Sequence, residues 1–213
     1  DLRTPLAGIK ASVATLQDPT IDLPESDRAA LLESAAEAAD RLDSLLSNLL
    51  DLSRIQTGAV RPILEPVSLD EVLQRALRGL PEDSVHDETD EHLPLVVTDA
   101  GLLERAVANL VENAVRHSPG GQPVRLCAAV VPDQRMQLRI VDRGPGVAAD
   151  DRERMFKPFQ RLGDVPAGSG VGLGLAVARG LAEAVGATLD AEDTPGGGLT
   201  MVVSIPVAGG GPS

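Results

Sequence analysis

The stretch NLVENAVRHSP, residues 109–119, places two asparagines four positions apart in a segment rich in Leu, Val and Ala. Residues four apart lie on one face of a helix, so Asn109 and Asn113 project to the same side. Asparagine is a poor helix former, and two on one face require a partner. Their carboxamide oxygens are hard ligands that could reach one phosphate-bound magnesium ion. The alternative is a pair of amides satisfied by helix caps or by the core.

A second stretch, VDRGPGV at residues 141–147, combines a carboxylate with two glycines. Asp142 ends an apolar strand, and Gly144 and Gly146 allow the chain to turn sharply beside it. Such a carboxylate can accept a hydrogen bond from an exocyclic amine, and the glycines let a flat ring approach the backbone. This combination suits adenine.

A third stretch, GSGVGLGLAVARGLAEA at residues 168–184, places glycines before and at the start of a helix. Gly168, Gly170, Gly172 and Gly174 expose backbone N–H groups to an anion, next to the positive end of the helix dipole. This pattern predicts a phosphate site. A glycine-rich loop by itself is equally typical of a flexible connection.

The residues before this region have a helical pattern as far as about Gly58, interrupted once by DPTIDLPES at residues 18–26. They predict an antiparallel helical hairpin. Its second arm carries a heptad seam that a lone hairpin would only partly bury, so two hairpins are expected to form a dimeric four-helix bundle. The alternative is an ordinary helix packed on the second domain. The seam consists of Ala35, Ala38, Leu42, Leu45, Leu49 and Leu52.

Short strands alternate with helices after the hairpin, which predicts an α/β sandwich of one mixed sheet under helices. The whole chain is therefore α+β. Residues 143–170 are too long for an ordinary connection and indicate a binding loop or lid. Helices are expected in 67–80, 100–118 and 174–185, and strands in 93–98, 124–131, 136–142, 187–193 and 199–206. The predicted division is 1–57 (hairpin), 58–66 (linker), 67–207 (nucleotide domain) and 208–213 (flexible tail).

The composition limits the possible partners. A net charge of −13 over 213 residues disfavours nucleic acid and anionic membranes, so bound phosphate must be held locally. The lone Cys127, in VRLCAAVV, is expected to be a core cysteine and implies neither a disulfide framework nor a metal cluster. No run of the sequence approaches the ~18 apolar residues of a membrane span.

In this order, the three stretches resemble the N, G1 and G2 boxes of sensor histidine kinases, and MFKPFQR at residues 155–161 resembles their F box. The resemblance implies a Bergerat-type ATP-binding fold in which the stretch after Gly146 closes over the nucleotide as a mobile lid. It assigns adenine to Asp142 and Mg²⁺ to Asn113. The ATP-binding residues so implied are Asn109, Asn113, Asp142, Gly144, Gly146, Phe156, Phe159, Gly168, Gly170, Gly172 and Gly174. The basic residues expected either to touch the γ-phosphate or to be solvated are Arg152, Arg154, Lys157 and Arg161.

The opening residues DLRTPL match the phosphoacceptor box of this family, which reads His, then Asp or Glu, then Leu-Arg-Thr-Pro. The resemblance places the phosphoacceptor histidine immediately before Asp1. It implies that Asp1 orients that histidine or accepts its proton, and that Thr4 positions a water for dephosphorylation of a partner. Apart from this resemblance, Asp1 is equally read as a negative charge near a helix start, and Thr4 as an ordinary residue of the first helical turn. The histidines expected at surface or capping positions are His86, His92 and His117.

The residue type at position 109 distinguishes a predicted kinase from a predicted ATPase. Gyrases, chaperones and mismatch-repair proteins share the ATP fold and resemble one another in having a glutamate at this position, which activates water. An amide cannot act as a general base near neutral pH, so the γ-phosphate is kept for a better nucleophile. Glu112 lies off the line of the two asparagines. The remaining alternatives are a Bergerat-fold ATPase and a non-catalytic, nucleotide-binding dimeric scaffold.

The stretches IKASVATL and LSNLLDLSRIQTGAV, with the acidic spacer, look like those of the Kdp-type potassium- and turgor-responsive sensor kinases. The resemblance to sensor histidine kinases implies ATP and Mg²⁺ as cofactors and a response-regulator receiver domain as partner, the heptad seam favours a homodimer, and the net charge of −13 disfavours nucleic acid. The Kdp-type likeness also implies that the chain is a cytoplasmic part of an inner-membrane sensor kinase.

Overall fold

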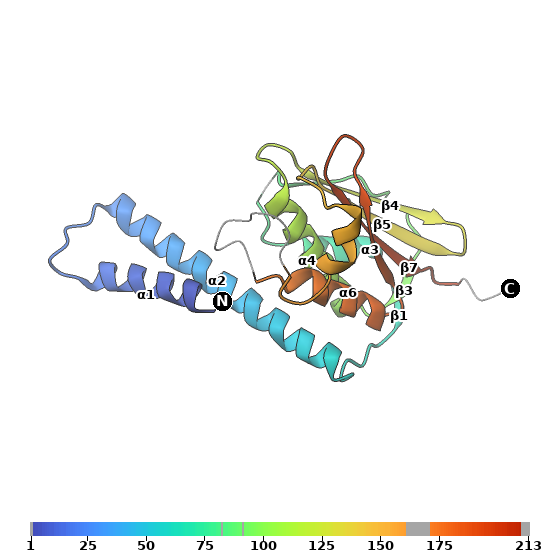
Figure 1. Cartoon of the computed structure of the whole chain (residues 1–213), viewed down its shortest axis with the longest axis horizontal. Coiled ribbons are helices and arrows are strands. Elements are labelled where there is room, and N and C mark those ends of the chain that lie inside the picture. The colour runs from blue at the N-terminus through green and yellow to red at the C-terminus, as the bar shows by residue number, and fades with distance from the viewer. Residues whose placement is uncertain (1, 82, 91, 161–170, 210–213) are drawn as a thin grey trace.

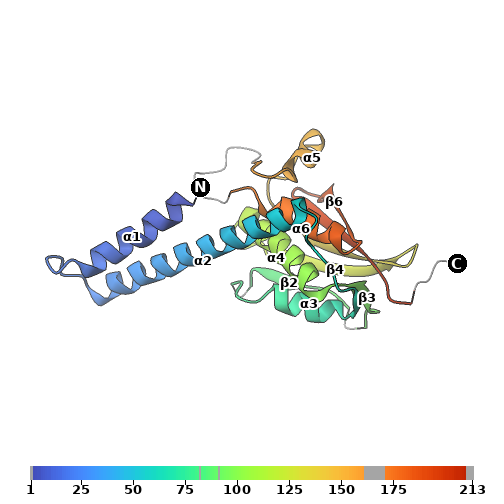
Figure 2. The ribbon, with the colours of Figure 1, turned by 90° about the horizontal axis from the view of Figure 1, so that it is seen from below.

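The computed structural model of the chain describes residues 2–81, 83–90, 92–160 and 171–209. It has two parts, a long helical hairpin and an α/β body (Figure 1), and a quarter turn shows the same arrangement from below (Figure 2). The element order and the sheet topology confirm the predicted fold class, a helical N-terminal region followed by an α/β domain with a mixed sheet. The division at residues 58–66 stays a prediction.

The hairpin consists of α1 (Arg3–Gln17) and α2 (Glu25–Gln56), which pack along each other. The connection turns at Asp18, whose Oδ1 accepts hydrogen bonds from N (2.9 Å) and Oγ1 (2.6 Å) of Thr20. Acidic residues in the first turn of α2 stabilise the positive end of that long helix. None of the helices in the described residues is long and apolar enough to cross a membrane.

The main sheet of the body has five strands in the order β2-β4-β5-β7-β6. Strand β2 runs parallel to β4, and the other neighbours are antiparallel, so the sheet is mixed as predicted. Alternate residues of β5 are fully buried on one face, where the helices pack, while the other face is more exposed. The strands are β2 (Val85–Asp87), β4 (Val124–Val131), β5 (Arg135–Val141), β6 (Thr188–Asp193) and β7 (Leu199–Pro206).

The prediction of a single sheet is wrong. The strand expected in 93–98 forms β3 (Val96–Thr98), which pairs antiparallel with β1 (Glu65–Val67) in a separate two-stranded sheet. An isolated bridge from Val96 to Val207 joins it to the segment after β7. Pro94, two residues before β3, has no N–H to donate to a longer ladder, and β1 supplies the antiparallel partner of β3.

The helices of the body are α3 (Leu69–Ala76), α4 (Ala100–His117) and α6 (Gly174–Ala184). Helix α4 packs against both of the others, and its apolar face is almost completely buried. Asp99 caps α4, because its Oδ1 accepts from the N of Leu102 at 3.1 Å. Its Oδ2 accepts from the N of Ile63 at 2.9 Å, which ties the linker to the start of the asparagine-bearing helix.

The C-terminal half of α2 lies against the body. Asp51 and Leu52 are only 3% and 7% exposed, and Asp51 forms an ion pair with Arg105 of α4. A Cβ built on Gly180 of α6 would lie 2.8 Å from Cγ2 of Ile55, so the two helices approach closely there. The hairpin is thus in contact with both helices that carry the predicted nucleotide motifs.

Candidate functional site

Asp142 lies just beyond the end of β5 and is 4% exposed. Its Oδ1 accepts hydrogen bonds from the N of Gly144 at 2.8 Å and from the N of Leu199 at 2.9 Å. One oxygen of the carboxylate is therefore occupied by two backbone amides, from its own turn and from the start of β7. These bonds fix the direction of the side chain and leave Oδ2 as the oxygen available to a ligand.

The glycines around Asp142 are explained by backbone packing within the chain. A Cβ on Gly144 would lie 2.8 Å from the carbonyl oxygen of His117. Gly146 has φ +73°, and a Cβ there would lie 3.2 Å from the carbonyl oxygen of Gly198. Gly198 itself has φ +113°, and a Cβ there would lie 2.1 Å from the carbonyl oxygen of Asp142. Glycine is therefore required here even before any ring approaches the backbone.

The first and third motifs meet where α4 passes the start of α6. Nδ2 of Asn109 donates to the carbonyl oxygen of Arg105 at 3.1 Å, so Oδ1 remains as the free acceptor. A Cβ built on Gly174 would lie 3.2 Å from that Oδ1. Asn113, one turn further along α4, is partly exposed. The amide oxygen of Asn109 thus lies beside the N-terminal turn of α6, where backbone N–H groups lack helical acceptors.

Helix α4 also reaches the Asp142 turn, at its other end. His117 closes the helix, is half-buried, and its carbonyl oxygen contacts the turn at Gly144. Burial lowers the pKa of His117, with a further contribution from Arg116, although Asp142 opposes the shift. His117, predicted at a surface or capping position, ends α4 as a capping residue could, but its side chain is half-buried. From Asn109 to His117 the helix axis advances about 12 Å.

The F-box motif separates into a buried and an exposed aromatic residue. The turn η1 (Ala149–Asp151) and α5 (Arg152–Met155) precede it, both within the segment predicted as a loop, and the last residue of α5 is the first of the F box. Phe156 is 6% exposed and belongs to the core, whereas Phe159 is 61% exposed with φ +63°. The N of Phe159 donates to the carbonyl oxygen of Gly172 at 2.9 Å, which brings residues 159 and 172 together.

Some predicted residues lie outside the described part of the chain: Asp1, Arg161, Gly168 and Gly170. Thr4 is exposed in the first turn of α1. Two of the basic residues considered for the γ-phosphate have carboxylate partners instead. Arg152 pairs with Asp193 of β6, and Arg154 pairs with Asp151.

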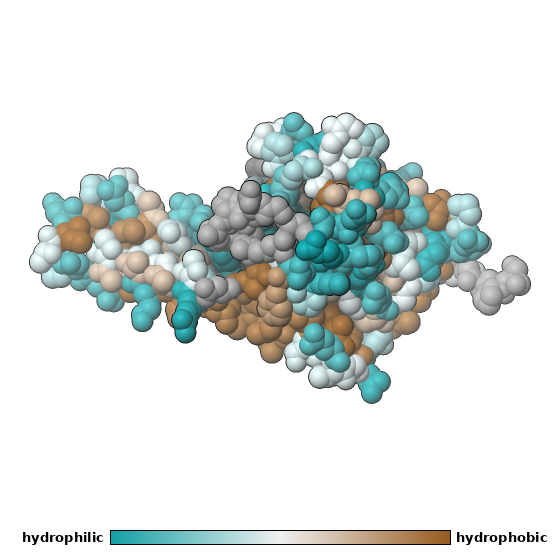
Figure 3. All heavy atoms as spheres, viewed as in Figure 1, coloured by the Kyte–Doolittle hydropathy of each residue, from teal (hydrophilic) through white to brown (hydrophobic). Residues whose placement is uncertain are grey.

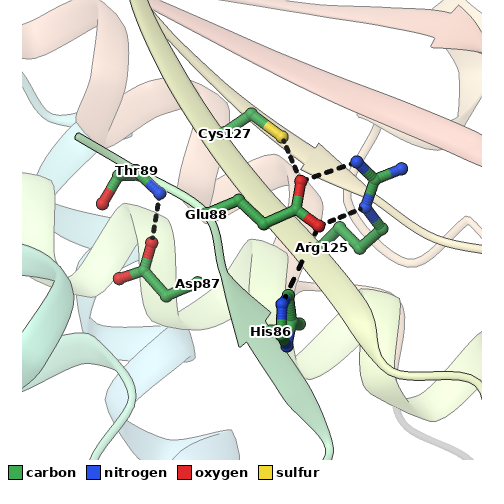
Figure 4. A network of polar contacts seen from close by, with 6 residues as sticks. All are labelled: His86, Asp87, Glu88, Thr89, Arg125 and Cys127. Atoms are coloured by element: carbon green, nitrogen blue, oxygen red, sulfur yellow. Dashed lines mark hydrogen bonds and ion pairs between the residues drawn. The ribbon is translucent and has the colours of Figure 1, made fainter.

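A polar network lies at the β2 edge of the sheet, where Arg125 of β4 lies opposite Val141 of β5 (Figure 4). Arg125 donates to both oxygens of Glu88, at 2.8 and 2.6 Å, and these bonds lower the pKa of Glu88 to about 2. The thiol of Cys127 donates to Oε2 of Glu88 at 3.5 Å. Cys127 is therefore a partly exposed residue on the open sheet face, not the predicted core cysteine. His86, also expected at the surface, lies 4.0 Å from the same carboxylate.

Glu88→Gln is expected to make Cys127 react faster with iodoacetamide. Burial raises the pKa of the Cys127 thiol, and the hydrogen bond to Glu88 and the charge of Glu88 raise it further. Removing that charge should lower the midpoint of the pH–rate profile and speed alkylation at pH 8 roughly threefold, because the thiolate is the nucleophile. His86→Gln, which alters the same network without touching the thiol, should leave the rate nearly unchanged. An unaltered profile in the Glu88 variant would contradict this interpretation.

The described residues contain no group of three or more His, Cys, Asp or Glu side chains that could hold a metal ion. Mg²⁺ usually keeps several waters and binds through one or two protein oxygens plus substrate phosphates. The amide oxygens of Asn109 and Asn113 are donors of that type.

Two family profiles match the chain. The His Kinase A (phospho-acceptor) domain matches residues 1–58, and the histidine kinase-, DNA gyrase B- and HSP90-like ATPase family matches residues 98–209. The chain belongs to the histidine kinase family. As a histidine kinase, it carries the phosphoacceptor and ATP-binding modules in the order predicted from DLRTPL and the three boxes.

Curated histidine kinases match nearly the whole chain. The Sensor protein KdpD of Mycobacterium tuberculosis (strain ATCC 25618 / H37Rv) is 42% identical over 96% of this chain, which spans 24% of that protein. The Sensor protein KdpD of Escherichia coli (strain K12) is 34% identical over 97% of this chain and 23% of that protein. The chain thus spans about a quarter of the length of these relatives, and the predicted Kdp-type resemblance is supported.

Solved histidine kinases share the architecture. The Acinetobacter baumannii histidine kinase AdeS is similar over 97% of both chains, with a TM-score of 0.72 and 26% identity. The mycobacterial sensor histidine kinase MprB is similar over 68% of this chain and 98% of that one, with a TM-score of 0.60 and 28% identity.

Proposed function

We propose that the chain is the ATP-dependent catalytic core of a protein-histidine kinase. It transfers the γ-phosphate of ATP to a histidine directly before Asp1 and then to an aspartate of a response-regulator receiver domain. One observation carries the proposal. Helix α4 has Asn109 beside the N-terminal turn of α6 at one point and, about 12 Å further on, ends against the Asp142 turn. A base and a triphosphate can lie along this helix.

In this proposal each residue has one role. Oδ2 of Asp142 accepts a hydrogen bond from the exocyclic amine of adenine. The amides around Gly172 and Gly174 bind phosphate oxygens at the start of α6, with Gly168 and Gly170 continuing that site. Asn113, with Asn109 beside it, ligates Mg²⁺. Magnesium, when bound, neutralises charge on the phosphoryl oxygens during transfer.

The remaining groups control the nucleophile. Asn109 offers no base to activate water, which favours transfer to histidine over hydrolysis. Asp1 orients the histidine or accepts its proton, and Thr4 positions a water for the reverse dephosphorylation. The glycines Gly144 and Gly146 shape the adenine turn. Phe156 and Phe159 belong to the stretch after Gly146 that would cover the nucleotide.

A homodimer through the hairpin belongs to the same proposal. Figure 3 shows an apolar area over the middle of α2, and apolar side chains exposed along both hairpin helices would be buried by a second hairpin. These side chains are Leu2, Leu6, Val13, Leu32, Leu46, Leu49 and Leu50. We also propose, on the resemblance to Kdp-type kinases, a longer membrane-anchored protein that responds to potassium or turgor.

The test restores a histidine before Asp1 and supplies magnesium and γ-labelled ATP. We expect an acid-labile, alkali-stable label on the protein, and none when that histidine is glutamine or when Asn113→Ala is introduced. Free phosphate without a protein label would establish an ATPase and overturn the role of Asn109. ATP binding with neither product would indicate a non-catalytic nucleotide-binding scaffold.

A further inference from the structure

Arg179 of α6 contacts two parts of the F-box segment, residues 152–160, which comprise α5 and the described part of the F box. Its Nη1 and Nη2 donate to the two oxygens of Glu153 in α5, at 2.9 and 3.2 Å. Its guanidinium carbon lies 4.2 Å from the centroid of the Phe156 ring. Its Nε is 3.7 Å from Glu183, one turn further along α6. The arginine therefore forms a paired hydrogen bond and a cation–π contact at the same time.

This contact requires the shape of arginine as well as its charge. A planar guanidinium can pair with both carboxylate oxygens while its face covers an aromatic ring, whereas a lysine ammonium is a point charge that does neither in the same way. The side chain of Arg179 is 25% exposed and Phe156 is 6% exposed, so the cation–π contact is largely shielded from water, whereas the side chain of Glu153 is 79% exposed. The arginine thus specifies one position of α5 and Phe156 relative to α6.

The position of α6 matters to the proposed phosphate site. The helix begins at Gly174, beside Oδ1 of Asn109, and the carbonyl oxygen of Gly172 accepts a hydrogen bond from the N of Phe159. The F-box segment therefore contacts the phosphate end of the site through Phe159 and the body of α6 through Arg179. Loss of the second contact would weaken the attachment of α5 to α6, while Phe156 stays in the core and Arg152 stays paired with Asp193 of β6.

We propose that Arg179 is a positioning residue for ATP: it holds α5 and Phe156 against α6, so that the amides at the start of α6 keep the geometry that binds the triphosphate. Arg179 acts through Glu153 and Phe156 without touching the nucleotide. The inference rests on the proposed function. It predicts a defect at the phosphate end of the site, because the adenine end is fixed separately by the amides that bind Asp142.

The experiment compares the binding of ATP with that of AMP, which presents the base without the β- and γ-phosphates. Arg179→Met is expected to weaken ATP binding about tenfold, the lower end of the loss seen when a residue that orients metal ligands is removed, while AMP binding stays close to that of the unaltered chain. Arg179→Lys should recover little of the loss. Glu153→Gln added to Arg179→Met should cause little additional loss, since Glu153 acts through Arg179.

A matched control is Arg139→Met. Arg139 of β5 also pairs with a glutamate, Glu192 of β6, but on the open face of the sheet. This variant should bind ATP and AMP like the unaltered chain. Equal losses of ATP and AMP binding in Arg179→Met, or no loss of ATP binding, would overturn the positioning role. An unaltered chain that binds no ATP would instead overturn the proposed function, and the role of Arg179 with it.

Discussion

Asp142→Asn is expected to weaken ATP binding at least about a hundredfold while the chain keeps its fold, because a site built for one hydrogen-bonding partner rejects its mismatch strongly. The asparagine oxygen can still accept from the amides of Gly144 and Leu199, as Oδ1 does now. The second position then carries an NH₂ donor in place of Oδ2. A donor would face the exocyclic amine of adenine, itself a donor. Titration with a fluorescent ATP analogue measures the loss, and circular dichroism checks the fold.

The same substitution should change base preference. Inosine triphosphate presents an acceptor oxygen where ATP presents the amine, so the preference for ATP over inosine triphosphate should shrink or reverse in the Asp142→Asn protein. Asp133→Asn makes the same chemical change in the exposed turn between β4 and β5, at φ +68°, which asparagine tolerates. That control should bind ATP normally. An Asp142→Asn protein that binds ATP as tightly as before would show that this carboxylate does not read adenine.

Periodic patterns made most of the fold predictable from the sequence. The apolar stripe of α4 and the alternation in β5 extend over enough residues to reveal their periods, and both elements lie close to their predicted bounds. Strands β1 and β2 each have three residues, too few for a two-residue period to be visible. Their existence depends on partners elsewhere in the chain, β3 and β4, which only the folded structure supplies.

Those parts of the candidate site could be predicted from the sequence in which a single residue, by its type and its immediate neighbours, indicates its own role. Asn109, Asp142 and the glycines could be singled out because their types are unusual in their positions. The sequence explains only in part why glycine is needed at these positions, because the carbonyl groups that approach Gly144 and Gly198 come from distant segments. Arg179 and Glu153 are 26 positions apart and carry no local signal that pairs them.

Arg105→Met is expected to lower the free energy of unfolding by about 3 kcal/mol, the typical cost of leaving a buried charge without its partner. Asp51 is 3% exposed where α2 meets α4, and Arg105 forms an ion pair with it. Arg105 is much more exposed, with 40% of its side chain accessible, so it can be solvated when alone. Asp51→Leu should therefore cost within about 1 kcal/mol and can stabilise the chain, because apolar replacements of buried charges often do.

The difference in stability between Arg105→Met and Asp51→Leu should depend on pH. Burial raises the pKa of Asp51, while Arg105 is the first of the groups that oppose the shift. Without Arg105 the pKa rises further, so the folded state binds more protons than the unfolded state between the ordinary aspartate pKa of 3.8 and the raised value. Stability in that window falls as the pH rises. The deficit of Arg105→Met should accordingly shrink towards pH 4 and be largest near neutrality.

Urea titrations of the two single variants and of the double variant, at pH 5 and pH 7.5, measure both effects. The double variant Asp51→Leu with Arg105→Met should recover most of the loss, since no buried charge remains. Arg139→Met, which breaks an exposed arginine–glutamate pair, should cost less than about 1 kcal/mol at both pH values. Equal, pH-independent losses for Arg105→Met and Asp51→Leu would mean that water reaches Asp51, and hence that α2 does not rest on α4 in solution. A large loss confined to the arginine variant identifies the ion pair as the contact that couples the hairpin to the helix carrying Asn109.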